Sequence, residues 1–511
     1  MELSQRLILN MSASIVLASS LHTGIAFADD DRDATDFGAK VEQKLNKQSK
    51  RLFGFKGPIR DSAAPTSGPV RTLSQTAADQ ILLAKGLKVE FLTRNAANLT
   101  DMLAFFPLNN PTHLISCVEG SRSIIDTNAN GSDKLNPSIQ RINLKNGEVT
   151  TVLRGLNRCD GIRTTPWGTI LATEESNDGG AYELINPLLS TELTIVARQD
   201  SNFIDINGNA VNNEIAYRAA LPTMAWEGLT VLESGVVIGG DELRPGTNIA
   251  DSDGGSIFKF VPSSPRAIGQ AVTRLTDSPL VSGNVFAMQV SCVNRRQQIG
   301  QGCEVGNAAW LPVNAATARA DANNNNATGY YRPEDLHLDA NFSDSSNADA
   351  IRFCWANTGN RGASNFGEVM CGIDSAPLTA EIDQRTVAVN RLIEGDTDLN
   401  APDNLAFQPN TGILYVIEDN PNGDVHACLP DGTDRNIKSD GCVKVLSVVD
   451  SSAEPSGFLF TDNGDTAYVS IQHSRDDLVP AVDSFGTDDV LKITGFRQLS
   501  RRNQDRDEDD D

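Results

Sequence analysis

One type of segment recurs six times along the chain, and this repeat constrains the fold more than any other feature. Five copies start with an acidic residue on a short apolar strand, and the sixth has a serine at this position with Glu454 two residues earlier; each copy then turns through Gly or Pro and ends in a second apolar strand followed by polar groups. The copies start at Asp101, Asp160, Glu227, Glu334, Asp403 and Ser456. Successive starts leave room for one four-stranded blade of roughly 40 to 50 residues plus loops. The sequence therefore predicts an all-β, six-bladed β-propeller with long loop insertions.

The remaining segments set the boundaries of this domain. Length alone suggests about three domains, but a ring of six repeats needs residues 76–498 as a single unit. We interpret residues 29–75, which are polar and charged, as a flexible N-terminal arm. Residues 499–511 are an acidic run that we expect to be disordered, and the asparagines at 323–326 indicate a long surface insertion.

The chain begins with features of an exported protein. An apolar stretch after Arg6 ends in Ala26-Phe27-Ala28, which predicts a Sec-type signal peptide cleaved after Ala28 and a periplasmic or extracellular location. The apolar stretch is too short and too interrupted for a membrane anchor, so no membrane span is expected.

Eight cysteines in an exported chain predict disulfides. Three pairs are close enough in sequence to close short loops: Cys292 with Cys303, Cys354 with Cys371, and Cys428 with Cys442. Cys117 and Cys159 remain. They either bond to each other or leave Cys159 free for chemistry.

The net charge of −24 restricts the possible partners. Nucleic acid is disfavoured as a partner, because phosphate backbones are bound through clusters of Lys and Arg. A strongly acidic surface suits a protein that gathers divalent cations, although solubility alone also explains most of these acids. We expect a monomer.

The acids of the repeat are the candidate metal ligands. The inner strand of each propeller blade lines the axis, so equivalent residues of different blades meet there. Converging carboxylates repel one another unless a cation such as Ca²⁺ binds them through oxygen. For any one acid, capping a turn is an equally good explanation. The set comprises Asp101, Asp160, Glu227, Glu334, Asp403 and Glu454. Acids at the hairpin ends, such as Glu174 and Glu175, give a weaker signal because only one of two neighbours can face inward.

Several segments together resemble the PhoX family of bacterial alkaline phosphatases. They are CDGIRTTPWGTILATEE, AWEGLTVLESGVVIGGDE, GGSIFKFVP, YRPEDLHLD, PDNLAFQPNTGILYVIED and EPSGFLFTDNGDTAYVSIQH. The resemblance extends from about residue 100 to about residue 495, and its most specific element is the Cys-x-Gly segment with Thr-Pro-Trp-Gly-Thr and Glu-Glu. It implies a six-bladed propeller that hydrolyses phosphate monoesters at an axial cluster of iron and calcium.

The resemblance also implies roles for individual residues. Cys159 would be a ligand of Fe³⁺, and Arg332 would grip the substrate phosphate. The implied carboxylate ligands are Glu227, Glu334, Asp403 and Glu454, joined by one or both of Glu174 and Glu175. A thiolate suits a transition metal, whereas carboxylates suit calcium.

Two other functions are compatible with the sequence. A calcium-dependent lactonase would also place acids around an axial cation, without a thiolate ligand. A non-catalytic, calcium-stabilised binding propeller would have all of its thiols bridged and its axial site closed. The leading hypothesis is a secreted metal-dependent phosphatase.

Overall fold

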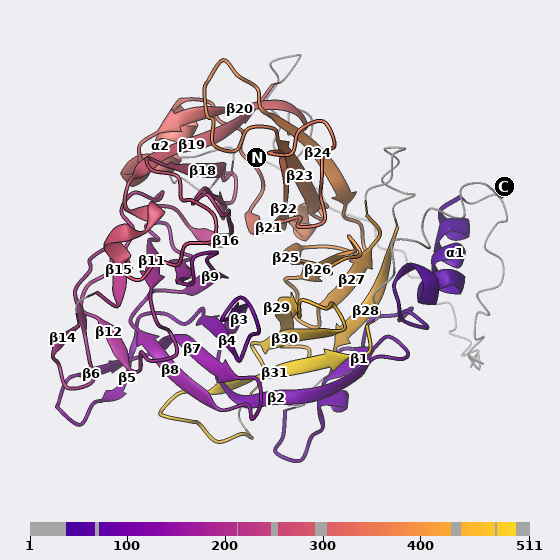
Figure 1. The fold of residues 1–511 in the computed structure, drawn as a ribbon. Helices are drawn as coiled ribbons and strands as arrows, with labels where there is room; N and C mark the ends of the chain where they lie inside the picture. The colour runs from indigo at the N-terminus through magenta and orange to yellow at the C-terminus, as the bar shows by residue number, and fades with distance from the viewer. Residues whose placement is uncertain are drawn as a thin grey trace, which may run out of the picture.

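A computed structural model describes residues 37–66, 71–211, 213–246, 254–291, 304–430, 441–475 and 478–496. Within these residues, antiparallel strands form six blades around a central axis, as Figure 1 shows. The prediction of an all-β, six-bladed propeller is therefore confirmed. The predicted signal peptide and acidic tail lie outside the described residues.

The first two blades follow each other directly in the chain. Blade 1 consists of β3 (Thr100–Phe106), β4 (His113–Val118), β7 (Pro137–Asn143) and β8 (Val149–Arg154). Its outer edge is extended by β12 (Leu193–Ile195), β13 (Phe203–Ile204) and β14 (Ala210–Val211). A separate hairpin pairs β5 (Ile124–Thr127) with β6 (Asp133–Leu135). Blade 2 consists of β9 (Cys159–Thr164), β10 (Ile170–Glu174), β11 (Ala181–Leu184) and β15 (Ile215–Tyr217).

Blades 3 and 4 share one continuous sheet. Blade 3 consists of β16 (Trp226–Val231), β17 (Val237–Asp241), β18 (Ile257–Pro262) and β19 (Gly283–Val290). Blade 4 consists of β21 (Pro333–Leu338), β22 (Ile351–Asn357), β23 (Glu368–Asp374) and β24 (Val387–Glu394). β20 (Gly306–Val313) pairs with both β19 and β24 and so joins the two blades. Part of the expected insertion is therefore ordered as β20 and the helix α2 (Ala318–Asn324).

The N-terminal part of the chain completes the last two blades. Blade 5 consists of β25 (Pro402–Phe407), β26 (Leu414–Glu418), β27 (Asp424–Cys428), β28 (Cys442–Val448) and β1 (Ile81–Leu83). Blade 6 consists of β29 (Glu454–Phe460), β30 (Thr466–Gln472), β31 (Thr487–Thr494) and β2 (Lys88–Ala97). The outermost strands β1 and β2 precede all other strands in sequence, so the ring is closed by pairing the start of the domain with its end.

The six inner strands β3, β9, β16, β21, β25 and β29 stand next to one another around the axis. Apolar residues on alternate positions of these strands and their neighbours fill the space between blades. All four tryptophans are buried there, with at most 1 % of their surface exposed. The packing fixes the inner strands, and with them the side chains that face the axis.

The N-terminal arm is more ordered than the sequence predicted. Residues 37–52 form the helix α1 (Phe37–Leu52), and Phe53 and Phe55 are buried in the core of blades 5 and 6. The expectation of a flexible arm over residues 29–75 is thus wrong for this part. The reason is that two aromatic side chains anchor an otherwise polar segment.

A buried ion pair fastens the closing strand. Arg71 donates to Asp489 of β31 at 2.8 Å, and both side chains are almost fully buried. Arg94 of β2 contacts the same carboxylate at 3.1 Å. Asp489 therefore holds together the segments that precede and follow the rest of the propeller.

Replacing Asp489 with alanine is expected to destabilise the protein by about 3–5 kcal/mol, because it leaves the guanidinium of Arg71 buried without a carboxylate. The measurement is urea unfolding followed by tryptophan fluorescence. As a control, Lys492→Ala breaks the exposed Lys492–Glu90 pair on the same strand and is expected to cost less than about 1 kcal/mol. Equal losses for both variants would contradict this role of Asp489.

Three disulfides are present in the described part of the chain, which indicates an oxidising compartment outside the cytoplasm. The predicted pairs Cys354–Cys371 and Cys428–Cys442 are confirmed. The predicted pair of Cys292 and Cys303 lies outside the described residues. No helix of the described residues is long and apolar enough to cross a bilayer.

Candidate metal centre

Each inner strand carries one extra residue relative to its hairpin partner, at the position where the repeat has its acid. In β3, Thr100 and Leu103 pair with Val118 and Ser116, which leaves Asp101 in a bulge. The same register shift occurs in β9, β16, β21, β25 and β29. A bulge re-aims a side chain relative to the regular strand. The repeated acid is therefore a feature of backbone geometry as well as of sequence.

The sixth blade differs from the other five. The bulge of β29 lies between Ser456 and Leu459, so the residue equivalent to Asp101 is Gly457. The sequence comparison placed Ser456 at this position, which is one residue too early. Gly457 has φ +56°, and a Cβ there would lie 2.4 Å from the carbonyl oxygen of Asp101. Close approach of the two backbones therefore excludes a side chain from the sixth position of the ring.

The other five blades bring their acids together at the axis. Three groups of carboxylates have oxygen atoms within 4.8 Å of one another, and neighbouring groups share one residue. The groups are Asp101 with Glu119 and Asp160, Asp160 with Glu175 and Glu227, and Glu227 with Glu334 and Asp403. We call these seven residues the carboxylate arc. Asp160 and Glu227 are its shared members and are the residues best placed to bridge two cations.

Burial makes the arc electrostatically costly. Burial first, and then the neighbouring acids, raise the pKa of Asp160 and of Glu227 far above the usual carboxyl range. Burial and Glu119 raise the pKa of Asp101 to about 8, and burial and Glu119 raise that of Glu175 to about 10. The pKa of Glu334 is raised less, to about 7, because Arg332 opposes the effect of burial. Without a cation, burial and mutual repulsion therefore favour the protonated forms of these groups.

The donor atoms of the arc fit a hard divalent cation. Each residue supplies a carboxylate oxygen, which is the ligand type that Ca²⁺ prefers. In addition, Oδ1 of Asp160 and Oδ1 of Asp403 are buried and have no hydrogen-bond partner among the described residues. Buried polar atoms in native proteins are normally satisfied. The unsatisfied oxygens at the centre of the arc are therefore consistent with ligands of a cation.

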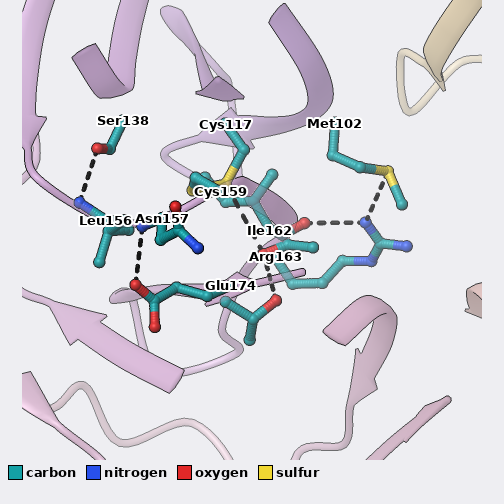
Figure 2. Close-up of a disulfide and its surroundings, with 11 residues drawn as sticks. Met102, Cys117, Ser138, Leu156, Asn157, Cys159, Ile162, Arg163 and Glu174 are labelled. Atoms are coloured by element: carbon teal, nitrogen blue, oxygen red, sulfur yellow. Dashed lines mark hydrogen bonds between the residues drawn. A yellow bond between two sulfur atoms is a disulfide. The ribbon is translucent and has the colours of Figure 1, made fainter. Parts of the chain in front are cut away.

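The ends of the second strands explain which acid of each neighbouring pair faces the axis. Glu174 accepts hydrogen bonds from the backbone N–H groups of Asn157 (Figure 2) and Gly180 and from Arg198, so both of its oxygens are already hydrogen-bonded. Glu175, the next residue, belongs to the arc. The prediction that Glu174 is a metal ligand is thus wrong, because its oxygens are used to hold the loop before β9, whereas the prediction for Glu175 is consistent with the geometry.

The same division of roles occurs in two other blades. Asp241 accepts from the N–H of Ala225, and Glu418 accepts from the N–H of Asn400. These acids hold the loops before β16 and β25. Their neighbours Glu242 and Asp419 instead contact Arg332 at the rim.

Two arginines occupy equivalent positions over the arc. Arg158 immediately precedes Cys159 in β9, and Arg332 immediately precedes Pro333 in β21. Both have positive φ, as do Leu99 before β3 and Ala401 before β25. In this strained conformation, the backbone carbonyl of each of the four residues accepts a hydrogen bond from a backbone N–H group. The donor is the residue that follows the second strand of the same hairpin.

Both guanidinium groups contact acids of the arc. Arg158 is paired with Glu119 and with Glu175. Arg332 contacts Glu334 at 2.9 Å, Glu242 at 2.6 Å and Asp419 at 3.3 Å. The acids raise the pKa of each guanidinium against the effect of burial, so both stay charged. The rim of an acidic site thus carries two fixed positive groups.

A polar network links the inner strands next to the arc. Arg163 of β9 donates to Asp335 of β21 at 2.8 Å, across β16, which stands between these strands. Asp335 also accepts from the N–H of Leu405 at 3.0 Å and contacts His337 at 3.2 Å. Arg163 further contacts the sulfur of Met102, as Figure 2 shows. These contacts connect β3, β9, β21 and β25.

Cys159 is bonded to Cys117, and both residues are fully buried (Figure 2). This corrects the prediction that Cys159 is an iron ligand, because a disulfide sulfur offers no thiolate to a metal. The sequence left this pairing open, since the two cysteines are 42 residues apart. They meet because β4 of blade 1 and β9 of blade 2 are neighbours in the ring. The prediction of bound Fe³⁺ rested on the thiolate of Cys159, and this thiolate is not present.

Single variants Cys117→Ser and Cys159→Ser are expected to behave alike. Each opens a loop of 42 residues and should cost about 4 kcal/mol of unfolding free energy by chain entropy. Each should retain its activity and metal content at a temperature where it is folded. The measurements are thermal unfolding, a thiol count of the denatured protein, and metal analysis. Loss of bound metal in Cys159→Ser but not in Cys117→Ser would restore the iron hypothesis.

Glu454 lies beside the arc but outside its three groups. Its carboxylate contacts Nε2 of His473 at 3.1 Å, and burial raises its pKa to about 7. The hydrogen bond to Glu454 in turn raises the pKa of His473 to about 9. The prediction that Glu454 is a metal ligand stays a prediction.

Sequence reasoning missed two residues of the site. They are Glu119, which belongs to the arc, and Arg158, which contacts it. Aligning the repeat identifies both of them. Glu119 follows β4 as Glu175 follows β10, and Arg158 precedes β9 as Arg332 precedes β21.

Comparison with known proteins yields similarity at the level of fold. No protein-family model matches the chain, and no curated protein sequence matches it. An oxidoreductase of the glucose dehydrogenase type from Thermus thermophilus is 12% identical, with 80% of this chain and 100% of that chain covered and a TM-score of 0.40. A luciferin-regenerating enzyme is 9% identical, with 81% and 98% covered and a TM-score of 0.40. The PQQ domain of a Coprinopsis cinerea pyranose dehydrogenase is 14% identical, with 81% and 97% covered and a TM-score of 0.34.

Proposed function

We propose that the chain is an extracytoplasmic, cation-dependent hydrolase of phosphate esters, of the kind that its resemblance to PhoX implies. The residues of the carboxylate arc would hold Ca²⁺, and Asp160 and Glu227 belong to two of its groups each. Bound cations would neutralise charge that develops on the phosphoryl oxygens and activate an oxygen nucleophile. The observation that carries the proposal is the pair of guanidinium groups, Arg158 and Arg332, at equivalent positions on the rim of an acidic arc.

The two arginines favour an anionic substrate over a neutral one. A planar guanidinium binds two phosphate oxygens at once, and two such groups facing one mouth suit a dianionic ester. A lactone is neutral, so it would gain no charge-assisted binding from either guanidinium group. In the cation-loaded protein, Glu119 and Glu175, which pair with Arg158, and Glu334, which pairs with Arg332, would serve as metal ligands, so each guanidinium would gain donors for the substrate.

The surrounding residues orient and enclose this site. Thr358 donates to Glu334, which fixes one end of the arc, while Glu242 and Asp419 hold Arg332 at the rim. Arg163 and Asp335 link the inner strands β9 and β21 beside the arc. We expect the substrate to approach the arc from the side of the two arginines.

The test compares substrates and variants in the presence of Ca²⁺ or a chelator. Wild type is expected to hydrolyse p-nitrophenyl phosphate with Ca²⁺, to stop with chelator, and to resume when Ca²⁺ is restored. Arg332→Ala and Arg158→Ala should each lower kcat/KM by about 100-fold, which is about 2.7 kcal/mol of lost transition-state binding.

The matched control is Arg274→Ala, which removes an exposed arginine paired only with the neighbouring Asp277 and should leave kcat/KM unchanged. Cleavage of a γ-lactone without turnover of any phosphate ester would replace this proposal with a calcium-dependent lactonase. Calcium-dependent stability without either activity would identify a non-catalytic binding propeller.

A further inference from the structure

A pocket of about 380 Å³ opens directly beside Arg332. Its walls come from five places in the chain: the loop after β22, the turn after β26, the segment that follows β17, and the residues that immediately precede β21 and β25. It shares Arg332, Thr358 and Asp419 with the rim of the carboxylate arc. Its volume is in the range of small-molecule sites. A molecule held at the arc could therefore extend into this pocket without leaving the rim.

The pocket is positively charged in a protein whose net charge is −24. Besides Arg332, it is lined by Arg244 and Arg361, and both are exposed. In the described part of the chain, neither of these two has a carboxylate within ion-pair distance. Asp419 is the acid of the lining, and it already contacts Arg332 at 3.3 Å. Two guanidinium forks are thus available to an anion that enters the pocket.

The loop that carries Arg361 is held in one conformation. The side-chain amide of Asn360 donates to the hydroxyl of Tyr331 at 3.1 Å, and its backbone N–H donates to the carbonyl of Asn365 at 2.8 Å. Gly359 has φ +75°, and a Cβ there would lie 2.6 Å from the backbone nitrogen of Gly367. The backbone on which Arg361 stands is therefore set before a ligand binds.

We propose that this pocket binds a second phosphate group of the substrate, so that the preferred substrates are phosphate monoesters that carry another phosphate. One phosphate lies at the carboxylate arc with Arg158 and Arg332, and the other is bound by Arg244 and Arg361. Arginine is suited to this task because its fork matches two phosphate oxygens. This inference rests on the proposed function and specifies its substrate class.

The first test measures kcat/KM with Ca²⁺ for two matched pairs of phosphate monoesters, glucose 1,6-bisphosphate with glucose 1-phosphate and adenosine 3′,5′-bisphosphate with AMP. Wild type is expected to prefer the doubly phosphorylated member at least 10-fold, through a lower KM. Arg244→Ala and Arg361→Ala should each remove most of this preference while changing turnover of p-nitrophenyl phosphate less than 2-fold. Preference in the glucose pair alone would assign the pocket to sugar bisphosphates, and in the adenosine pair alone to nucleoside bisphosphates.

A binding measurement separates this inference from the proposed function. Calorimetric titration of the Ca²⁺-loaded protein with glucose 1,6-bisphosphate should show affinity at least 10-fold weaker in Arg361→Ala than in wild type or in Arg274→Ala. Equal kcat/KM for both members of each pair, with active turnover of p-nitrophenyl phosphate, would overturn the second site alone. Failure to hydrolyse any phosphate ester would overturn the proposed function, and unchanged binding in Arg361→Ala would overturn the second site independently of activity.

Discussion

Replacing Glu227 with glutamine is expected to lower kcat/KM for p-nitrophenyl phosphate by about 100-fold or more while making the cation-free protein more stable. Glu227 belongs to two of the three groups of the arc, so its loss weakens two adjacent cation sites at once. Burial and the neighbouring acids, above all Asp160, raise its pKa far above the usual range, so without a cation the folded state must either take up a proton at Glu227 or keep a buried charge, and both oppose folding. A neutral amide removes this cost.

The opposite signs of these two effects distinguish a ligand from a structural residue. The measurements are steady-state kinetics with Ca²⁺ and thermal unfolding in chelator. Glu233→Gln is the matched control, because Glu233 is an exposed acid at the tip of the same hairpin and contacts Arg266 at 3.4 Å. It should change neither quantity. A Glu227→Gln variant that keeps its activity, or that unfolds more easily in chelator, would contradict the role given to Glu227.

Removal of Ca²⁺ is expected to make stability fall as pH rises, and addition of Ca²⁺ to abolish this fall. Burial raises the pKa of Asp101 from 3.8 to about 8 and that of Glu334 from 4.5 to about 7. Between the low values of the unfolded chain and these high values, the folded cation-free protein binds more protons than the unfolded one. Raising the pH from about 4 to about 8 therefore favours unfolding, by roughly 1.4 kcal/mol per pH unit for each such carboxyl group.

Bound Ca²⁺ opposes this fall in stability because it replaces the protons on the carboxylate oxygens. Ca²⁺ at 1,000 times its dissociation constant should add about 4 kcal/mol of stability at pH 8, and much less at pH 5, where protons compete for the same oxygens. Differential scanning calorimetry between pH 5 and 8.5, with Ca²⁺ or chelator, measures both trends. A melting temperature in chelator that does not fall between pH 5 and 8 would contradict the charged arc, and Mg²⁺ in place of Ca²⁺ tests the size of the sites.

The fold could be predicted from the sequence because the repeat records it directly. An acid, a turn and two apolar strands recur once per blade, and the closure of a ring follows from their number. The seven residues of the arc include five of the six acids predicted at the axis, together with Glu175. These predictions succeeded because the repeat can be read directly from the sequence.

The errors concern contacts that periodicity does not encode. Whether Glu174 or Glu175 faces the axis depends on which backbone N–H groups lie nearby, and Gly180 and Asn157 supply them to Glu174. The disulfide of Cys159 depends on the order of neighbouring blades. The buried place of Phe55 depends on a surface formed by strands more than 300 residues later in the chain. Each error concerns a partner that is distant in sequence.

The closure of the ring by β1 and β2 has a consequence for biosynthesis. Both strands leave the ribosome before any other strand of the propeller, yet their partners β28 and β31 belong to the last two blades. During translation and export the early strands thus have no sheet to join until those blades are made. The repulsion between the acids arises as neighbouring blades pack against each other, so we expect cation loading to accompany the assembly of the ring.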